Sequence, residues 1–303
     1  MSNFQNVRYS SDLFFGAIFV GTLISISGSN WIVVWTGLEL NIMSFLGWIC
    51  TCSSRSLSFI RNWGRWHSTS FYPANVEPFA KYFLAQSVGT AFFLFSPLLW
   101  GSPNLVAFSP FFLLFGMILK RGVAPFHQWF PSVCANVPWS VNVILAFWQK
   151  IAPLYIMTTA CLLNSGFFFI VALINLFFGA VGGLGQTQLR PLLAYSSISH
   201  IGWMIGLIGL SKIGFFYYFL LYGLIVVPTL IVFCKISVYR FKQMETLRAS
   251  YFRMVILSCL FVLRVAGIPP FRGFFIKVYR VYLMVLRGNY ILSLFFVFFA
   301  AVR

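Results

Sequence analysis

The chain has 303 residues, of which 60% are hydrophobic and 8% are charged, and its mean hydropathy is +0.89. A soluble domain needs far more charge than this to cover its surface, so the composition excludes a soluble globular protein. The net charge of +17 would suggest nucleic-acid binding in a soluble chain. Here the basic residues sit in short loops without a long basic run, so we expect no nucleic-acid partner.

Apolar runs longer than about 18 residues recur from end to end, as expected of transmembrane helices. The runs are continuous rather than alternating, which favours helices over a β-barrel. We predict an all-α membrane protein, a bundle of about ten transmembrane helices that forms a single domain over residues 1–303. The predicted spans are residues 12–29, 30–52, 79–100, 108–133, 139–163, 166–184, 190–210, 213–235, 251–286 and 289–303.

Two of these spans contain helix-breaking sequences. The fourth carries KRGVAPF at residues 120–126, and the ninth carries AGIPPFRGF at residues 266–274. Proline removes a backbone donor and clashes with the carbonyl four residues back, so we predict broken helices at Pro125 and at Pro269-Pro270. Membrane proteins tolerate such breaks where they are buried or wet. If the ninth span is two full helices, the count is eleven.

Basic residues are distributed unequally between the two sides of the predicted bundle. The N-terminal side carries Arg8, Arg55, Arg61, Arg65, Lys81, Arg190, Lys235, Arg240, Lys242, Arg248 and Arg253, and the opposite loops carry Lys212, Arg280 and Arg287. This bias places the N-terminus and the loops at 53–78 and 236–250 on the cytoplasm-equivalent side, which is the matrix for an inner mitochondrial protein. The N-terminus resembles neither a secretory signal nor a transit peptide, so an organelle chain of this kind would be made inside the organelle.

The cysteines and histidines do not form a recognisable metal site. None of the cysteines forms a CxxC pair, and most lie in apolar runs, so we expect no disulfide framework and no metal site. The cysteines are Cys50, Cys52, Cys134, Cys161, Cys234 and Cys259.

Six cationic side chains and one acid, Glu39, lie inside or beside the predicted spans, and each needs an explanation because a charge at mid-membrane costs about 3 kcal/mol or more. The six cations are Lys120, Arg121, Lys150, Arg264, Arg272 and Lys277. Glu39 lies near the middle of the second span, Lys120 and Lys150 lie near the centres of the fourth and fifth, and Lys277 follows the second break. We predict that these four residues form a proton path. A lone lysine could instead pair with an acid of a neighbouring chain or reach an interface.

The prolines beside two of these lysines strengthen the prediction. Pro125 should free the carbonyl of Arg121, and Pro153 that of Gln149. Free carbonyls favour a cation while burial disfavours it, so a lysine there can gain and lose a proton during a working cycle.

Other polar residues in the spans have weaker assignments. His127 and His200 could relay protons, or they could be polar residues hydrogen-bonded within the bundle. Arg264 and Arg272 more often mark helix ends than proton sites.

Six segments with these residues resemble one family in order and spacing: WTGLELNIMSF, KYFLAQSVGTAFFLFS, KRGVAPFHQWFPSV, WQKIAP, GGLGQTQLRPLLAYSSISHIGWM and GIPPFRGFFIK. The chain resembles NADH–ubiquinone oxidoreductase chain 2, the antiporter-like subunit family of respiratory complex I, over nearly its whole length from about residue 12. The family usually continues into a further helix, whereas this chain stops at Arg303, so either that helix is lost in this lineage or the sequence is incomplete.

The resemblance implies roles for four residues. Glu39 matches the key membrane glutamate of the family, Lys120 the lysine of the first broken helix, Lys150 the central lysine and Lys277 the lysine beside the second break. In the family these residues form a hydrated polar axis whose proton movement is coupled to quinone reduction elsewhere.

The resemblance also implies partners and a location. NAD, FMN, iron–sulfur clusters and ubiquinone would bind other subunits of the complex, and this chain would hold no cofactor. Its partners would be other membrane-arm subunits and the lipid bilayer, including cardiolipin, in the mitochondrial inner membrane.

Two other functions remain open on the sequence. A stand-alone cation/proton antiporter of related fold would need a cation site, against which one buried acid and three buried lysines argue. A purely structural subunit would need no water along the axis.

Overall fold

The computed structural model describes residues 2–61, 76–101, 105–159, 165–243, 256, 259–260, 263–264, 267 and 272–302. In these residues the regular structure is helical apart from one isolated bridge between Gln188 and Arg240. The all-α prediction is therefore confirmed for these residues, and the count of about ten spans stays a prediction.

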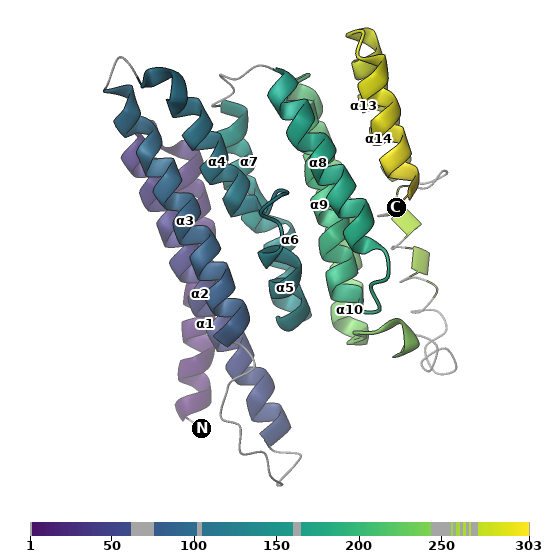
Figure 1. Ribbon diagram of the computed structural model, residues 1–303. Coiled ribbons are helices and arrows are strands. Elements are labelled where there is room, and N and C mark those ends of the chain that lie inside the picture. Colours follow the sequence, from purple (N-terminus) through teal and green to yellow (C-terminus); the bar gives the residue numbers. More distant parts are fainter. Residues whose placement is uncertain are drawn as a thin grey trace.

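The helices stand roughly side by side and follow the chain across the molecule (Figure 1). Helix α1 packs along α2, α3 along α4, and α8 along α9, while α13 and α14 lie at the far edge. The elements are α1 (Ser2–Ser27), α2 (Trp31–Arg61), α3 (Val76–Trp100), η1 (Val106–Phe108), α4 (Ser109–Arg121), α5 (Trp129–Asn136), α6 (Trp139–Ala146), η2 (Trp148–Lys150), α7 (Ile151–Thr159), α8 (Ser165–Gly183), α9 (Leu189–Ile208), α10 (Lys212–Ile236), α13 (Arg272–Leu286) and α14 (Tyr290–Val302).

Six helical segments of the described chain are long and apolar enough to cross a membrane. They are Trp31–Cys52, Glu77–Trp100, Trp139–Thr159, Gly166–Gly183, Leu189–Ile208 and Lys212–Ile236. Large apolar side chains such as Leu13, Ile213 and Ile291 are exposed on the outer surface of the bundle. A surface of this kind suits lipid or neighbouring transmembrane helices, so the chain is a multi-pass membrane protein.

The predicted break in the fourth span is confirmed. Helix α4 ends at Arg121 because Gly122 adopts a left-handed conformation with a φ of 62°, which favours glycine. Val123 N–H donates to the carbonyl of Ile118 at 3.1 Å, which closes the helix end, and helix α5 starts only at Trp129. Residues 122–128 are thus irregular backbone inside a bundle, where every polar group needs a partner.

Side chains from other elements supply those partners. Gln86 donates to the carbonyl of Lys120 at 2.9 Å. Trp129 donates through Nε1 to the carbonyl of Leu119 at 3.2 Å. The amide of Ala124 donates to Oδ1 of Asn175 at 2.9 Å. The carbonyls that receive these side-chain donors belong to Leu119 and Lys120, whereas Pro125 predicted a free carbonyl at Arg121, so that prediction is not confirmed.

The prediction of a continuous helix over residues 139–163 is wrong. Helix α6 ends at Ala146, a short 3₁₀ turn covers Trp148–Lys150, and α7 begins at Ile151. Pro153 explains the interruption, since it cannot donate to the carbonyl of Gln149 and its ring excludes a regular turn there. This break places Lys150 at the junction of two short helices.

One further predicted boundary needs correction, and three predicted features fall outside the described residues. Helix α2 continues to Arg61, so it includes part of the predicted loop at 53–78. The predicted break at Pro269-Pro270 and the side chain of Arg272 lie outside the described residues, as does Cys161.

Candidate functional site

The break after α4, at residues 122–128, and the break after α6, at residues 147–150, lie beside one buried polar cavity. The centre of a water molecule can occupy a volume of about 20 Å³ in this cavity, which is enough for about one water molecule. Its wall contains Lys120, Arg121 and Lys150 together with the amide side chains of Asn41, Gln86 and Gln149. Residues 30 positions apart in the sequence are thus brought to one polar space, as the proton-path prediction requires.

Lys120 lies in the last turn of α4 and is only 4% exposed. Its Nζ atom is buried and has no hydrogen-bond partner among the residues that the structure describes. The negative end of the α4 dipole favours a cation at this position. An ammonium or amine held in this way needs water or another mobile partner, since leaving a buried polar group unpaired is costly.

The side chain of Arg121 connects the end of α4 with the break after α6. Its Nη2 atom donates to the carbonyl of Gln149 at 2.6 Å, and its Nε atom has no partner among the described residues. The carbonyl of Gln149 is the group that Pro153 was predicted to free, so this part of the sequence argument is confirmed. The sequence did not predict that Arg121 would be its donor.

Lys150 is 1% exposed and is held by Tyr222 of α10. Its Nζ atom donates to the Tyr222 hydroxyl at 2.8 Å and lies 4.8 Å from the centre of the tyrosine ring. The hydroxyl in turn donates to the carbonyl of Ala146 at 3.3 Å, which the end of α6 leaves free. The break in the fifth span thus supplies both the lysine and the acceptor that orients its partner.

His200 of α9 extends the polar groups beyond Lys150. Its ring lies 5.1 Å from the ring of Tyr222, and its Nδ1 atom is 2.7 Å from the hydroxyl of Tyr218. A side chain that carries either a donor or an acceptor at this nitrogen can pass a proton between such groups. His200 is therefore placed next to the tyrosine that holds Lys150, and its role in proton transfer stays a prediction.

His127 is placed differently. Its Nδ1 atom is 3.2 Å from the carbonyl of Pro125, and its ring packs 4.9 Å from that of Phe178 and 6.4 Å from that of Tyr195. It does not line the cavity. The alternative of a polar residue hydrogen-bonded within the bundle fits this position.

Glu39 and Lys277 lie at the two ends of the predicted path. Glu39, on α2, is partly buried and interacts electrostatically with Lys120. Lys277, on α13, is 6% exposed, and its Nζ atom would lie only 2.7 Å from a side chain added at Gly267. The Nζ atom of Lys277 thus lies near Gly267, two residues before Pro269 in the sequence, and neither Glu39 nor Lys277 lines the cavity itself.

Arg280 is a buried cation that the sequence analysis misplaced. We predicted it in a loop, yet it lies within α13, fully buried, one helical turn beyond Lys277. Its Nη1 atom donates to the carbonyl of Gly202 at 3.2 Å, and its guanidinium stacks 3.9 Å from the centre of the Phe296 ring. Glycine at 206 makes room for it, because any added side chain there would meet the guanidinium.

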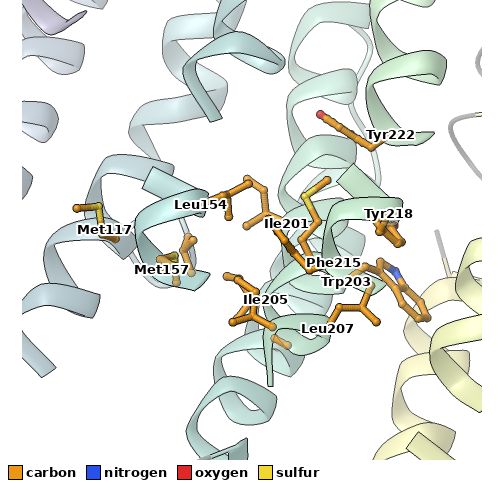
Figure 2. Close-up of a cluster of buried hydrophobic side chains, with 14 of the residues drawn as sticks. Met117, Leu154, Met157, Ile201, Trp203, Ile205, Leu207, Phe215, Tyr218 and Tyr222 are labelled. Carbon is orange, nitrogen blue, oxygen red and sulfur yellow. The ribbon is translucent and has the colours of Figure 1, made fainter. Parts of the chain in front are cut away.

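A large apolar cluster surrounds these polar groups. It includes Met117 of α4, Leu154 of α7, Ile205 of α9 and Phe215 of α10, with Tyr222 at its edge (Figure 2). Such surroundings lower the effective dielectric and strengthen interactions between the charges that they enclose.

A second, larger cavity of about 410 Å³ lies at the end of α4 where that helix begins. Hydroxyl groups of Ser25, Ser96, Ser109 and Tyr155 are on residues that line it, beside Trp31 and Trp100. Tryptophan and tyrosine are enriched at membrane–water interfaces, so this vestibule suits water.

Comparison with known proteins identifies relatives along most of the chain. Residues 29–302 match the family described as NADH:quinone oxidoreductase/Mrp antiporter, TM. NADH-ubiquinone oxidoreductase chain 2 of Locusta migratoria is 33% identical over 275 residues, which cover 88% of this chain and 73% of that protein. The protein of the same name from Lumbricus terrestris is 34% identical over 295 residues, which cover 92% of this chain and 82% of that protein.

Solved structures show the same fold at lower sequence identity. A chain of respiratory complex I from Thermus thermophilus with bound aureothin has a TM-score of 0.80 and is 22% identical, over 97% of this chain and 68% of that chain. A chain of the Mrp complex from Dietzia sp. DQ12-45-1b has a TM-score of 0.78 and is 16% identical, over 94% of this chain and 57% of that chain.

Proposed function

Since the chain belongs to the NADH:quinone oxidoreductase/Mrp antiporter transmembrane family, with NADH-ubiquinone oxidoreductase chain 2 among its relatives, we propose that it is a core membrane-arm subunit of respiratory complex I. In that role it takes part in proton translocation and belongs to a proton-translocating enzyme. NADH, flavin, iron–sulfur clusters and ubiquinone act in other subunits.

The observation that carries the proton-transfer role is the shared cavity. Lys120 and Lys150 line one buried polar space at two helix breaks, and Lys120 has no fixed partner among the described residues. Water in this space would carry a proton from one lysine to the other, because water both donates and accepts. Glu39 balances the charge on Lys120 from the α2 side.

The path continues beyond the cavity through residues that lie in contact. Lys150, which the Tyr222 hydroxyl holds, passes its proton toward His200, whose ring lies 5.1 Å from that of Tyr222, and Lys277 is the last member of the path. A charge change in a neighbouring subunit shifts the balance at Glu39 and Lys120, and the proton leaves when the balance reverses. We further propose a mitochondrial inner membrane location with the N-terminus in the matrix, and contacts with other membrane-arm subunits and with lipid, including cardiolipin.

The experiment is Lys150→Met in the assembled complex, reconstituted in liposomes. The variant should assemble, since methionine fills much the same volume, and it should translocate fewer protons per electron than the wild type. Lys81→Met is the matched control, because Lys81 is exposed on α3 and pairs with Glu77 at 2.5 Å. A normal proton-to-electron ratio in assembled Lys150→Met would reject the role of Lys150.

A further inference from the structure

Arg121 is a third cation in the cavity of the two lysines, and the proton path does not use it. Its side chain is 4% exposed and lines the same wall as Lys120 and Lys150. Arginine keeps its charge inside proteins, whereas lysine loses its proton readily when buried. Arg121 therefore differs from both lysines in the one property that matters for proton transfer.

The position of Arg121 is fixed at both ends. It follows Lys120 directly in the last turn of α4, and its guanidinium donates at 2.6 Å to the carbonyl of Gln149, the residue before Lys150. Helix α4 and the 3₁₀ turn at Trp148–Lys150 thus hold the guanidinium near both lysines. Arg121 also interacts electrostatically with each of them.

A permanent charge on Arg121 makes it costly for Lys120 and Lys150 to be protonated at the same time. If both lysines were protonated, three cations would face one partly buried acid, Glu39, in an apolar surrounding. Releasing one proton removes the most costly repulsion, because like charges are poorly screened there. The other titratable groups that interact with Arg121 are Tyr82 on α3 and Tyr222 on α10.

We propose that Arg121 is a positioning residue, a permanent positive charge that lets only one of Lys120 and Lys150 hold a proton at a time. The empty lysine is then ready to accept the proton of the other. Arg121 itself neither gains nor loses a proton. This inference rests on the proposed function of the two lysines.

The test is the pH profile of the proton-to-electron ratio for Arg121→Gln in the assembled complex. Glutamine keeps an amide donor at this position but has no charge. Without the cation both lysines hold protons to higher pH, so the profile should move upward by about one pH unit, because removing a nearby like charge from a poorly screened site has an effect of this order. A profile that stays in place overturns the proposal.

Arg287→Gln is the matched control. Arg287 donates to the carbonyls of Gly209 and Leu210 at the end of α9 and does not line the cavity. The same substitution there should leave the profile unchanged. A shift of equal size in Arg287→Gln would mean that Arg121 has no special effect, and it would overturn the proposal.

A second variant covers the case in which Arg121→Gln does not assemble. Asn41 also lines the cavity, and its Oδ1 atom accepts from Nε2 of Gln149 at 2.8 Å. Asn41→Asp keeps this acceptor and adds a negative charge, so it should also move the profile upward. A wild-type profile in Asn41→Asp contradicts the proposal.

The two proposals can fail separately. If Lys150→Met pumps normally, the role of the lysine is wrong. If Lys150→Met pumps poorly while Arg121→Gln and Asn41→Asp keep the wild-type profile, only the role of Arg121 is wrong.

Discussion

Replacing Tyr222 with phenylalanine tests how the protein holds a proton on Lys150. The hydroxyl of Tyr222 accepts from Nζ of Lys150 at 2.8 Å, and it is the one hydrogen-bond acceptor of that atom among the described residues. Phenylalanine keeps the ring that lies 4.8 Å from Nζ, so packing and the cation–π contact remain. The substitution therefore removes the hydroxyl alone.

The size of the effect follows from the bond that is lost. A hydrogen bond to a charged group contributes about 1.5–3 kcal/mol, so protonated Lys150 should lose roughly 2 kcal/mol, a factor of about 30 in proton affinity. Lys150 would then release its proton at a lower pH. The profile of the proton-to-electron ratio should move downward by about one to two pH units, opposite in sign to the shift expected of Arg121→Gln.

The assay is proton uptake per electron by the reconstituted complex across a range of pH around neutrality. Pumping by Tyr222→Phe should be low at neutral pH and should recover in more acidic medium. Tyr279→Phe is the control, since Tyr279 is exposed on α13 and does not line the cavity. An unchanged profile in an assembled Tyr222→Phe complex would refute the reasoning, because the hydroxyl would then not hold the proton.

Three further predictions concern packing and access. Gly206→Ala should destabilise the fold by about 1–3 kcal/mol, because its methyl group meets the guanidinium of Arg280; thermal unfolding of the purified complex measures this. Asn175→Leu should cost about 1–3 kcal/mol, because it leaves the buried amide of Ala124 without its acceptor; the same unfolding measurement applies. Ser29→Cys should react with a charged thiol reagent from one side of the membrane, because Ser29 is exposed and lines the 410 Å³ vestibule.

Each of these predictions has a control in the chain. Gly16→Ala should have little effect, since nothing lies within 4 Å of the added atom. Asn175→Asp keeps the acceptor and should lose less stability than the leucine variant. Met117→Cys should resist the reagent, since Met117 is fully buried in the apolar cluster. Equal behaviour of variant and control would contradict the corresponding prediction.

The sequence predicted the helical architecture because long apolar runs leave the backbone few alternatives in lipid. It also predicted the first break, from Pro125, although the residue that ends α4 is Gly122. The second break, at Trp148–Lys150, was missed. A proline near the start of a helix is tolerated, so Pro153 alone did not reveal that α6 ends at Ala146.

Prediction of the site was more limited, because its contacts join residues far apart in the sequence. Pro153 predicted a free carbonyl at Gln149, but no local pattern could identify Arg121 as the donor. Arg280 had a signal that was overlooked: it lies three residues after Lys277, and residues at that spacing share one face of a helix. Counting it as a loop residue hid a second buried cation on α13.

The central claim is that a proton passes between Lys120 and Lys150 through water in their shared cavity. The most direct measurement is a density map of the assembled complex at a resolution that shows ordered water. We expect a water molecule within hydrogen-bond distance of Nζ of Lys120, on the side that faces Arg121 and Lys150. A cavity closed by side chains or filled by a lipid tail, with no water beside Lys120, would contradict the account.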